Sequence, residues 1–599
     1  MDQLPPEIIE LILSASCLRV EDIVSCSKIC SRFRRIIFSS SYIWKCKFRD
    51  KWPQFMDWFD KDFTQWFEET RYIYELSHRT LTILSTMSSR FYKKSELSDC
   101  DLEEWKKIVE ETPRSYEYVV QDLMANLCFC DDINTFQVIP PDTPGNLTLR
   151  YYAAKVLRYI RHHHLSKLLL DYLNLPAEDQ ILEKGATFVA QWCQPTLNIN
   201  WILIASQLDH IANQVRYSVR TRYPNHELLK VSTKKFEKWK HKNIEDNQWN
   251  TDECRQLMLC LRDVLYNQYK FKGNNSAFYM PENSYIHEVL LKKQGLPIML
   301  AIIYEGVARR VGLKCVPINY PGHFLLRFTE GKREKPGISY YINVFNCGDT
   351  MLTVPSEQSA VCPTAKEVVE RMANNLELSC RQHITNAHGN VTHLRTVMEL
   401  CYLINPHDIS LIVGLSRIYM WNNIDTRRLE NYLLERGSLS QQEQHIIDML
   451  RNYNVHLIHN FIELMQIQPK TRPTNLLYAV GMVMRHLVFN YICVIYDWDP
   501  VCSASMQWQQ QMGVHKLRFK DQQPFYNVLV EDSSHRYVAQ ENLITTNEAG
   551  FLSLHDDLGR YFSHYFETHY VPNAEKEKEF PDDKDIRYAF HKKMVGLID

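Results

Sequence analysis

Apolar residues recur at helical spacing in the first fifty residues of the chain. The segment Leu4-Pro5-Pro6-Glu7 places prolines where a first helical turn tolerates them, and an acid where the helix dipole favours it. The apolar positions that follow are Ile8, Ile9, Ile12 and Leu13. A second apolar run begins near Asp22, and Trp44 closes the segment. This pattern predicts a compact helical unit over residues 1–50.

Helical patterning continues from residue 51 and changes between residues 295 and 345. We expect residues 51–145 to be a helical linker region that ends in the breaker-rich stretch Ile139–Asn146. Helical spacing then returns from Tyr151 to about Leu261. Three short runs of β-forming residues follow, at Lys314–Tyr320, Phe324–Phe328 and Tyr340–Phe345. The pattern predicts an α+β domain over residues 146–362.

A helical segment and a β-rich segment complete the chain. Residues 363–470 contain a helix-turn-helix pair of tetratricopeptide type, without the 34-residue period of an array. Residues 471–575 contain β-like runs that predict a small antiparallel barrel: Val480–Leu487, Tyr491–Tyr496, Tyr526–Val530 and Tyr537–Val538. We expect residues 576–599 to be a C-terminal tail. The predicted fold class is therefore multidomain and predominantly α.

Composition narrows the possible partners and compartments. The 69 Lys and Arg residues against 71 Asp and Glu leave a net charge of −2, so the whole chain has no positive field for nucleic acid or anionic membrane. Its 17 cysteines are odd in number and scattered, which argues against a disulfide framework and for a reducing compartment. Neither a secretory signal nor an apolar stretch of about 18 residues is found. We expect a cytosolic or nuclear protein with no membrane partner.

Cofactor and metal motifs are missing from the sequence. There is no GxGxxG and no GxxxxGK[ST], so nucleotide hydrolysis is not expected. The segment His287–Leu291 lacks the second histidine of a zinc-protease helix. His162–His164 is a triplet on a helix whose side chains point about 100° apart, and we expect it to be solvated. We predict no cofactor and no metal.

His323 is the most site-like residue, because it stands in a Pro-Gly turn at the start of a predicted strand, Tyr320–Phe324. A thiol enzyme would need a cysteine whose thiolate this imidazole could stabilise. Cys315 lies eight residues before it, inside the preceding β-like run. Catalysis and hydrogen bonding within the fold both remain open for His323 at this point.

Residues 4 to 46 resemble an F-box, through LPPEIIELIL, EDIVSCSKICSRFRRII and YIWKCKF. The resemblance implies that these helices bind the Skp adaptor, which connects to a cullin ubiquitin-ligase scaffold. About forty residues bury too small a core to be stable alone, so a partner's groove would stabilise them. The positions that match the family's adaptor-binding pattern are Leu4, Pro5, Ile8, Ile12, Leu13, Ile23, Val24 and Trp44.

Residues 150 to 360 resemble the SirB-type transglutaminase-like proteins, through GATFVAQWCQP, FKGNN, NSYIHEVLLKKQGLPIMLAIIYEGVARRVGL and PINYPGHFLLR. The superfamily uses a Cys, His, Asp triad whose cysteine opens a helix, which here would begin near Gly295. No cysteine occurs there. His323 matches the family histidine, and Asn343 stands where the acid is expected. The resemblance therefore implies a degenerate triad and a domain without catalysis.

Residues 474 to 570 resemble the HspQ or YccV domain, also labelled hemimethylated-DNA-binding, through VGMVMRH, YICVIYDWDP, QPFYNVLVED and YVAQENL. Six Lys and Arg face ten Asp and Glu between residues 473 and 570, so we doubt DNA binding. Lys516, Arg518 and Lys520 stand at alternate positions and would share one face of a strand. The run Pro524–Tyr526 suits either barrel core, which we favour, or a ligand surface.

The three resemblances together imply a substrate-recognition subunit of a Skp-cullin-F-box ubiquitin ligase. Such a subunit recruits a client protein for ubiquitination and degradation, and other subunits supply the chemistry. Two alternatives stay open: a cysteine-type hydrolase or acyltransferase that uses His323, and a DNA or chromatin adaptor that works through the C-terminal domain. The predicted partners are the Skp adaptor, the cullin scaffold and a protein client.

Overall fold

The computed structural model describes residues 4–127, 146–320, 322–353, 360–384, 391–435, 440–464, 467–546 and 555–594. The predicted linker Ile139–Asn146 lies outside the described residues except for Asn146. The chain divides into two compact units, one of Met1–Met87 with Lys107–Ala125, and one of Ser88–Lys106 with Asn126–Asp599. Among the helices described, none combines the length and the apolar character that crossing a bilayer requires.

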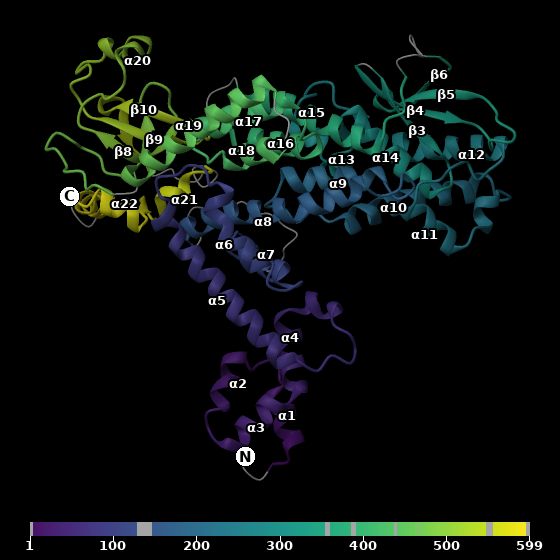
Figure 1. Cartoon of the computed structure of the whole chain (residues 1–599), viewed down its shortest axis with the longest axis horizontal. Helices are drawn as coiled ribbons and strands as arrows, with labels where there is room; N and C mark the ends of the chain where they lie inside the picture. Colours follow the sequence, from purple (N-terminus) through teal and green to yellow (C-terminus); the bar gives the residue numbers. More distant parts are fainter. Residues whose placement is uncertain are drawn as a thin grey trace. The chain divides into compact units, whose positions relative to one another are not determined.

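The first unit is helical. Its elements are α1 (Pro6–Leu13), α2 (Val20–Cys26), α3 (Ser31–Ser39), α4 (Ser41–Lys51), the 3-10 turn η1 (Pro53–Trp58), the first part of α5 (Trp66–Phe91), the end of α6 (Glu103–Val109), and α7 (Ser115–Leu127) (Figure 1). Aromatic rings join the first four helices to α5, because the rings of Trp44 and Phe67 lie 5.0 Å apart and those of Phe48 and Trp66 lie 5.4 Å apart. The first fifty residues therefore share a core with the helix that follows them.

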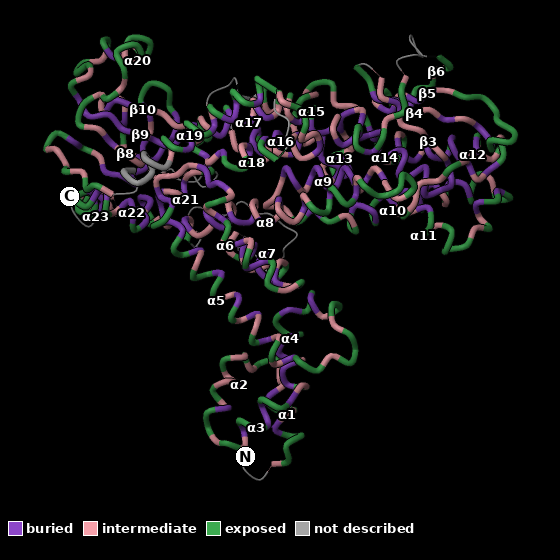
Figure 2. Tube along the Cα trace, in the orientation of Figure 1, coloured by how far each residue is buried: buried purple, intermediate pink, exposed green. Residues whose placement is uncertain are grey.

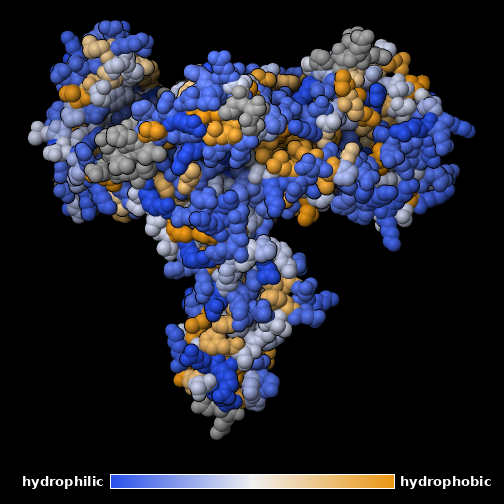
Figure 3. Space-filling view, viewed as in Figure 1, coloured by the Kyte–Doolittle hydropathy of each residue, from blue (hydrophilic) through white to orange (hydrophobic). Residues whose placement is uncertain are grey.

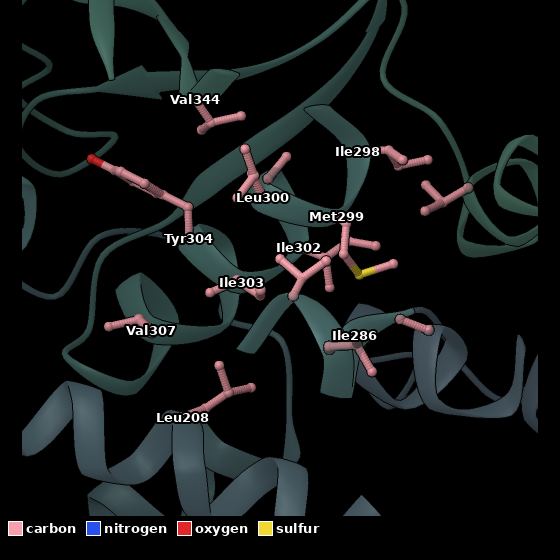
Figure 4. Close-up of a cluster of buried hydrophobic side chains, with 14 of the residues drawn as sticks. Leu208, Ile286, Ile298, Met299, Leu300, Ile302, Ile303, Tyr304, Val307 and Val344 are labelled. Atoms are coloured by element: carbon pink, nitrogen blue, oxygen red, sulfur yellow. The ribbon is translucent and has the colours of Figure 1, made fainter. Parts of the chain in front are cut away.

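The second unit contains the predicted α+β domain, built around one buried helix. Every residue of α14 (Pro297–Arg310) from Ile298 onward is buried, as expected of a helix that is apolar on most sides. Figure 4 shows its side chains, including Ile302 and Ile303, packed with Leu208 and Val344 from other elements. The helices that pack directly on α14 are α9 (Leu182–Cys193), α10 (Trp201–Arg222), α11 (Thr233–His241) and α13 (Ile286–Lys292). Behind them, α8 (Leu147–Leu173) packs on α9, and α12 (Thr251–Arg262) packs on α10 (Figure 2).

A four-stranded antiparallel sheet, in the order β3-β4-β5-β6, packs against α14. The strands are β3 (Cys315–Tyr320), β4 (His323–Thr329), β5 (Ser339–Asn343) and β6 (Asp349–Met351). The first three confirm the β-like runs that the sequence predicts. Two further short strands, β1 (Lys272–Gly273) and β2 (Gln294–Gly295), form a parallel pair just before α14.

The helical segment that follows confirms the predicted helix-turn-helix pair, formed by α16 (Val391–Ile404) and α17 (Ile409–Trp421). Its neighbours are α15 (Ala365–Ile384), α18 (Arg427–Glu435) and α19 (Gln441–Leu464). Part of this segment belongs to the α+β core, because Trp192 on α9 donates a hydrogen bond to the carbonyl of Thr396 on α16, at 2.8 Å.

The C-terminal region is a five-stranded antiparallel sheet in the order β10-β9-β8-β7-β11. Its strands are β7 (Val483–His486), β8 (Ile492–Asp499), β9 (Phe525–Val530), β10 (His535–Ala539) and β11 (Leu543–Thr545), and a hairpin of β12 (Phe562–Phe566) and β13 (His569–Pro572) stands beside it. Four of these strands confirm the predicted runs. The edge strands β10 and β11 share no ladder among the strands described, and the 3-10 turn η9 (Gln540–Asn542) joins them directly.

Two predictions for this region are corrected. Lys516, Arg518 and Lys520 do not lie on a strand: Gly513 at φ +70° begins a 3-10 turn after α20 (Met506–Gln511), and Lys520 has φ +49°. Residues 576–594 are not a simple tail. They form the end of α22 (Ala574–Glu579) and α23 (Asp583–Met594), after α21 (Leu558–Tyr561), and buried Asp583 accepts hydrogen bonds from the backbone of Val480 and the indole of Trp498.

Candidate functional site

The exposed face of α1 is the first candidate site. Pro5 caps the helix, Pro6 stands at its first position where no backbone N–H is needed, and Glu7 lies in the first turn. Ile9 and Leu13, four residues apart, point into the core of the unit. This fixes the orientation of α1 and turns its second apolar face outward.

That second face carries Ile8, Leu11 and Ile12, which have helical spacing and exposed fractions of 43%, 60% and 41%. Pro5 beside them is also exposed. Ile29, just before α3, is 69% exposed. We call Pro5, Ile8, Leu11, Ile12 and Ile29 the apolar surface of the N-terminal helices. Figure 3 shows hydrophobic residues at the surface of this region.

The remaining residues of the predicted adaptor-binding set lie at or below this surface. Leu4 and Val24 are half-buried. Leu13, Ile23 and Trp44 are buried, and the indole N–H of Trp44 donates to the carbonyl of Ile37 at 2.7 Å. These three side chains form the core that supports the helices, so they are not available as direct contacts in this structure.

Two cations connect the helices beneath the surface. The ammonium of buried Lys47 on α4 donates to the carbonyls of Ala15 at 2.5 Å and Leu18 at 2.8 Å, just after α1. Burial lowers the pKa of Lys47. The Arg32 guanidinium donates to the carbonyl of Leu4. The beginning and the end of α1 are therefore both held, which presents its outer face in a defined position.

His323 is the second candidate, and the structure places it at an exposed hairpin tip. It follows Gly322, whose φ of +73° suits a glycine in the turn. Its backbone carbonyl accepts a hydrogen bond from Arg371 at 2.9 Å. The histidine that the sequence singles out thus stands at the surface, at the start of β4.

Cys315, the thiol nearest to His323 in the preceding strand, is not positioned to pair with it. On β3, Tyr320 is paired with His323, whereas Cys315 is paired with Phe328. Cys315 therefore lies five residue steps along β3 from the hairpin tip, a distance of roughly 16 Å. Cys315 is also buried, and burial raises the pKa of its thiol well above the ordinary value. The first turn of α14 offers Pro297, Ile298 and Met299 instead of a cysteine.

Asn343, the residue at the family's acid position, has a local structural role. Its side-chain oxygen accepts from the backbone N–H groups of Phe345 at 3.2 Å and Asn346 at 3.4 Å, and so caps the 3-10 turn after β5. The Asn343 side chain therefore stabilises this turn. The degenerate-triad assignment of His323 and Asn343 remains a prediction.

The prediction that His162 is solvated is wrong. It is buried rather than solvated, and its ring stacks on Trp192 of α9 with centroids 4.1 Å apart. Its Nε2 lies 2.8 Å from the Trp192 carbonyl. Burial, followed by the charge of Arg158, lowers the pKa of His162 to about 3, so the ring is neutral at physiological pH.

One cluster of described residues has the composition of a metal site: His535, His555 and Asp557, whose ligand atoms lie within 4.8 Å of one another. The geometry favours a hydrogen-bonded cluster instead. His535 Nε2 is 2.9 Å from the Asp557 carboxylate, and His555 Nδ1 accepts the Asp557 backbone N–H at 3.1 Å. A neutral His555 then carries its proton on Nε2, where a metal would need a lone pair.

Family models match three parts of the chain. A model described as F-box-like matches residues 1–50, one described as transglutaminase-like superfamily matches residues 203–370, and one described as hemimethylated DNA-binding protein YccV like matches residues 476–569. All three resemblances inferred from the sequence are confirmed. No solved structure gives a significant match.

Similar proteins extend this agreement over nearly the whole chain. F-box only protein 21 of Pongo abelii is 30% identical over 98% of this chain and 92% of its own length. The proteins of the same name from Mus musculus and Homo sapiens are also 30% identical over 98% of this chain, and over 93% and 92% of their own lengths. Identity at this level across all three domains shows that the chain belongs to the F-box only protein 21 family.

Proposed function

We propose that this chain is a substrate-recognition subunit of a Skp-cullin-F-box ubiquitin-protein ligase. Its N-terminal helices bind the Skp adaptor, and its second unit recruits a client protein for ubiquitination and degradation. The F-box-like match and the F-box relatives support this role. The observation that carries this proposal is the apolar surface of the N-terminal helices, where Ile8, Leu11 and Ile12 of α1 are exposed together.

Physical chemistry supports a protein partner for that surface. Single exposed apolar residues are common, but several at helical spacing on one face of a short helix form a patch typical of protein contacts. Interfaces gain most of their affinity from a few apolar anchors that become fully desolvated. A helix held at both ends, as α1 is by Lys47 and Arg32, loses little freedom on binding.

The proposal assigns no ligation chemistry to this chain. A thiol mechanism needs a nucleophile and its base, and loss of either removes most of the rate. His323 lies at an exposed tip, roughly 16 Å along the hairpin from Cys315. Other subunits and the ubiquitin-charged conjugating enzyme would therefore supply the reactive groups.

We expect thiol-directed activity probes to find no activated cysteine. The exposed Cys347 and Cys362 should label at the rate of ordinary free thiols, equally in the native chain and in His323→Ala. His210→Ala, which removes an exposed imidazole of α10, serves as the control. Rapid stoichiometric labelling of one cysteine that His323→Ala abolishes and His210→Ala does not would revive the enzyme interpretation.

The function itself is tested by affinity purification of the full chain, with and without an inhibitor of the cullin pathway. Clients that are normally degraded should accumulate on the native chain only when the pathway is inhibited. The variant Ile8→Ala with Leu11→Ala, uncoupled from the adaptor, should retain the same clients without the inhibitor. If neither inhibitor nor variant changes the set of retained proteins, the chain does not work as a ligase receptor.

A further inference from the structure

A cavity of about 320 Å³ in the second unit has an unusual charge balance. It lies among α8, α16, α17, α18 and the 3-10 turn η2 (Asp99–Leu102), and its lining includes neither His323 nor any residue of α1. This volume is at the lower end of the range of small-ligand pockets. Its floor is formed by charged side chains that are nearly all buried.

Three cations share two carboxylates in that floor. Lys155 donates to Glu96 at 2.6 Å, and Arg395 donates to Glu96 at 2.9 Å and to Glu399 at 2.7 Å. Arg158 contacts the same two carboxylates at 3.3 and 3.2 Å. The side chains of all five are at most 16% exposed. Among these five side chains the cations therefore outnumber the carboxylates by one.

Arg158 is the cation that the carboxylates satisfy least. Its two contacts are the longest of the set. On Glu96 it shares Oε2 with Arg395, and on Glu399 it reaches Oε2 while Arg395 and Tyr419 bind Oε1. Its Nε is buried and has no hydrogen-bond partner among the residues that the structure describes. Thr392 and Tyr419 occupy further positions on the carboxylates, each at 2.8 Å. A buried guanidinium with an unused donor is costly unless another acceptor approaches it.

The remaining charges around the cavity do not remove this excess. Asp99 pairs with Arg428 at 2.6 Å, and Glu103 and Lys106 at the rim contribute one charge of each sign. His162 also lines the cavity and is neutral at physiological pH. The residues that line the cavity therefore carry about one net positive charge.

We propose that this cavity binds an anionic group, a carboxylate or a phosphate, with Arg158 as its main contact. Arginine suits this task because its planar guanidinium offers several donors to such oxygens. The anionic group belongs to an acidic or phosphorylated residue of the client. This part of the proposal rests on the proposed function, because it requires that the chain recruits a client. A free inorganic anion has the same chemistry and is separated from the client residue by experiment.

The test is calorimetric titration of the full chain with capped tripeptides that differ only at the central residue. Glutamate and phosphoserine peptides should bind, and the matched glutamine peptide should bind at least tenfold more weakly. Inorganic phosphate is titrated in parallel. If phosphate binds and neither acidic peptide does, the site takes a free anion and the client source is rejected.

Two variants separate binding from folding. Arg158→Gln should weaken acidic peptides at least tenfold and leave the melting temperature of the ligand-free chain unchanged or higher, because it removes an uncompensated buried charge. Ser166→Phe fills the cavity without a change in charge and should also abolish binding. Lys167→Gln, on the exposed side of α8, is the matched control.

Equal binding of glutamate, phosphoserine and glutamine peptides, with no response to phosphate, would overturn the proposal. So would full affinity in both Arg158→Gln and Ser166→Phe. Adaptor binding is measured on the same preparations, since none of these residues lies in the N-terminal helices. A chain that binds the adaptor but no anion would reject this inference alone, and a chain that binds anions but no adaptor would reject the proposed function alone.

Discussion

Glu183→Ala is expected to lower the unfolding free energy of the second unit by about 3–5 kcal/mol, the cost of breaking a buried ion pair from one side. Glu183 on α9 accepts from Arg309 at 2.5 Å and from Arg310 at 2.8 Å, both on α14. The side chains of Glu183 and Arg309 are fully buried, and that of Arg310 is 2% exposed. The alanine variant would leave Arg309 and Arg310 without this shared carboxylate in the interior of the domain.

The pH dependence of this loss has a defined sign. Burial by itself would raise the pKa of Glu183, but Arg309 and Arg310 outweigh it and hold the pKa at about 2. A carboxyl whose pKa falls on folding stabilises the native state above its unfolded pKa of about 4.3. The stabilisation decreases as the pH falls through about 2. The destabilisation by Glu183→Ala should therefore be full at pH 7 and shrink below about pH 4.

Thermal and urea unfolding of the full chain measure this effect. The matched control is Glu227→Ala, because the Glu227–Lys230 pair is short at 2.6 Å but its side chains are 55% and 70% exposed. Exposed pairs of this kind contribute little to stability, so Glu227→Ala should unfold close to the native chain. If the two variants unfold at the same temperature and urea concentration, the buried cluster does not stabilise α14 as described.

The architecture could be predicted from local pattern wherever one residue type dominates a segment. The β-branched and aromatic runs of β3, β4, β8 and β9 could be predicted as strands from the sequence. The assignment of Phe525 and Tyr526 to the core could be predicted as well, and both residues are buried. Features that depend on distant segments were not visible. His162 is buried because Trp192 of another helix covers it, and helix α23 packs on the sheet through Asp583. Neither contact can be predicted from the apolar periodicity of a single segment.

The apolar surface of the N-terminal helices shows the same limit. Ile8, Ile9, Ile12 and Leu13 form one apolar stretch in the sequence, and helical spacing does not tell which face is turned inward. Packing against α3 and α4 selects Ile9 and Leu13 for the core. Leu11 and Ile29 were missed, although Leu11 lies three residues from Ile8 on the same face. A search for a second stripe on α1 could have found Leu11, but no local signal identifies Ile29.

Truncation of side chains in the apolar surface of the N-terminal helices should abolish adaptor binding and leave the stability of the fold unchanged. Loss of one interface anchor typically costs about 2 kcal/mol, and two together should weaken binding by more than a factor of 100. Ile8 and Leu11 contribute little to the core because they are exposed, and alanine is the best helix former. The double variant Ile8→Ala with Leu11→Ala should therefore melt at the temperature of the native chain.

The dissociation constant of the purified Skp adaptor for the full chain is the most direct measurement. Leu81→Ala is the matched control, because Leu81 on α5 is 44% exposed in the same unit but lies outside the apolar surface. We predict native affinity for Leu81→Ala, and affinity more than a hundredfold weaker for Ile8→Ala with Leu11→Ala. Native affinity in the folded double variant would contradict the account, because the apolar surface of α1 would then not be the site where the adaptor binds.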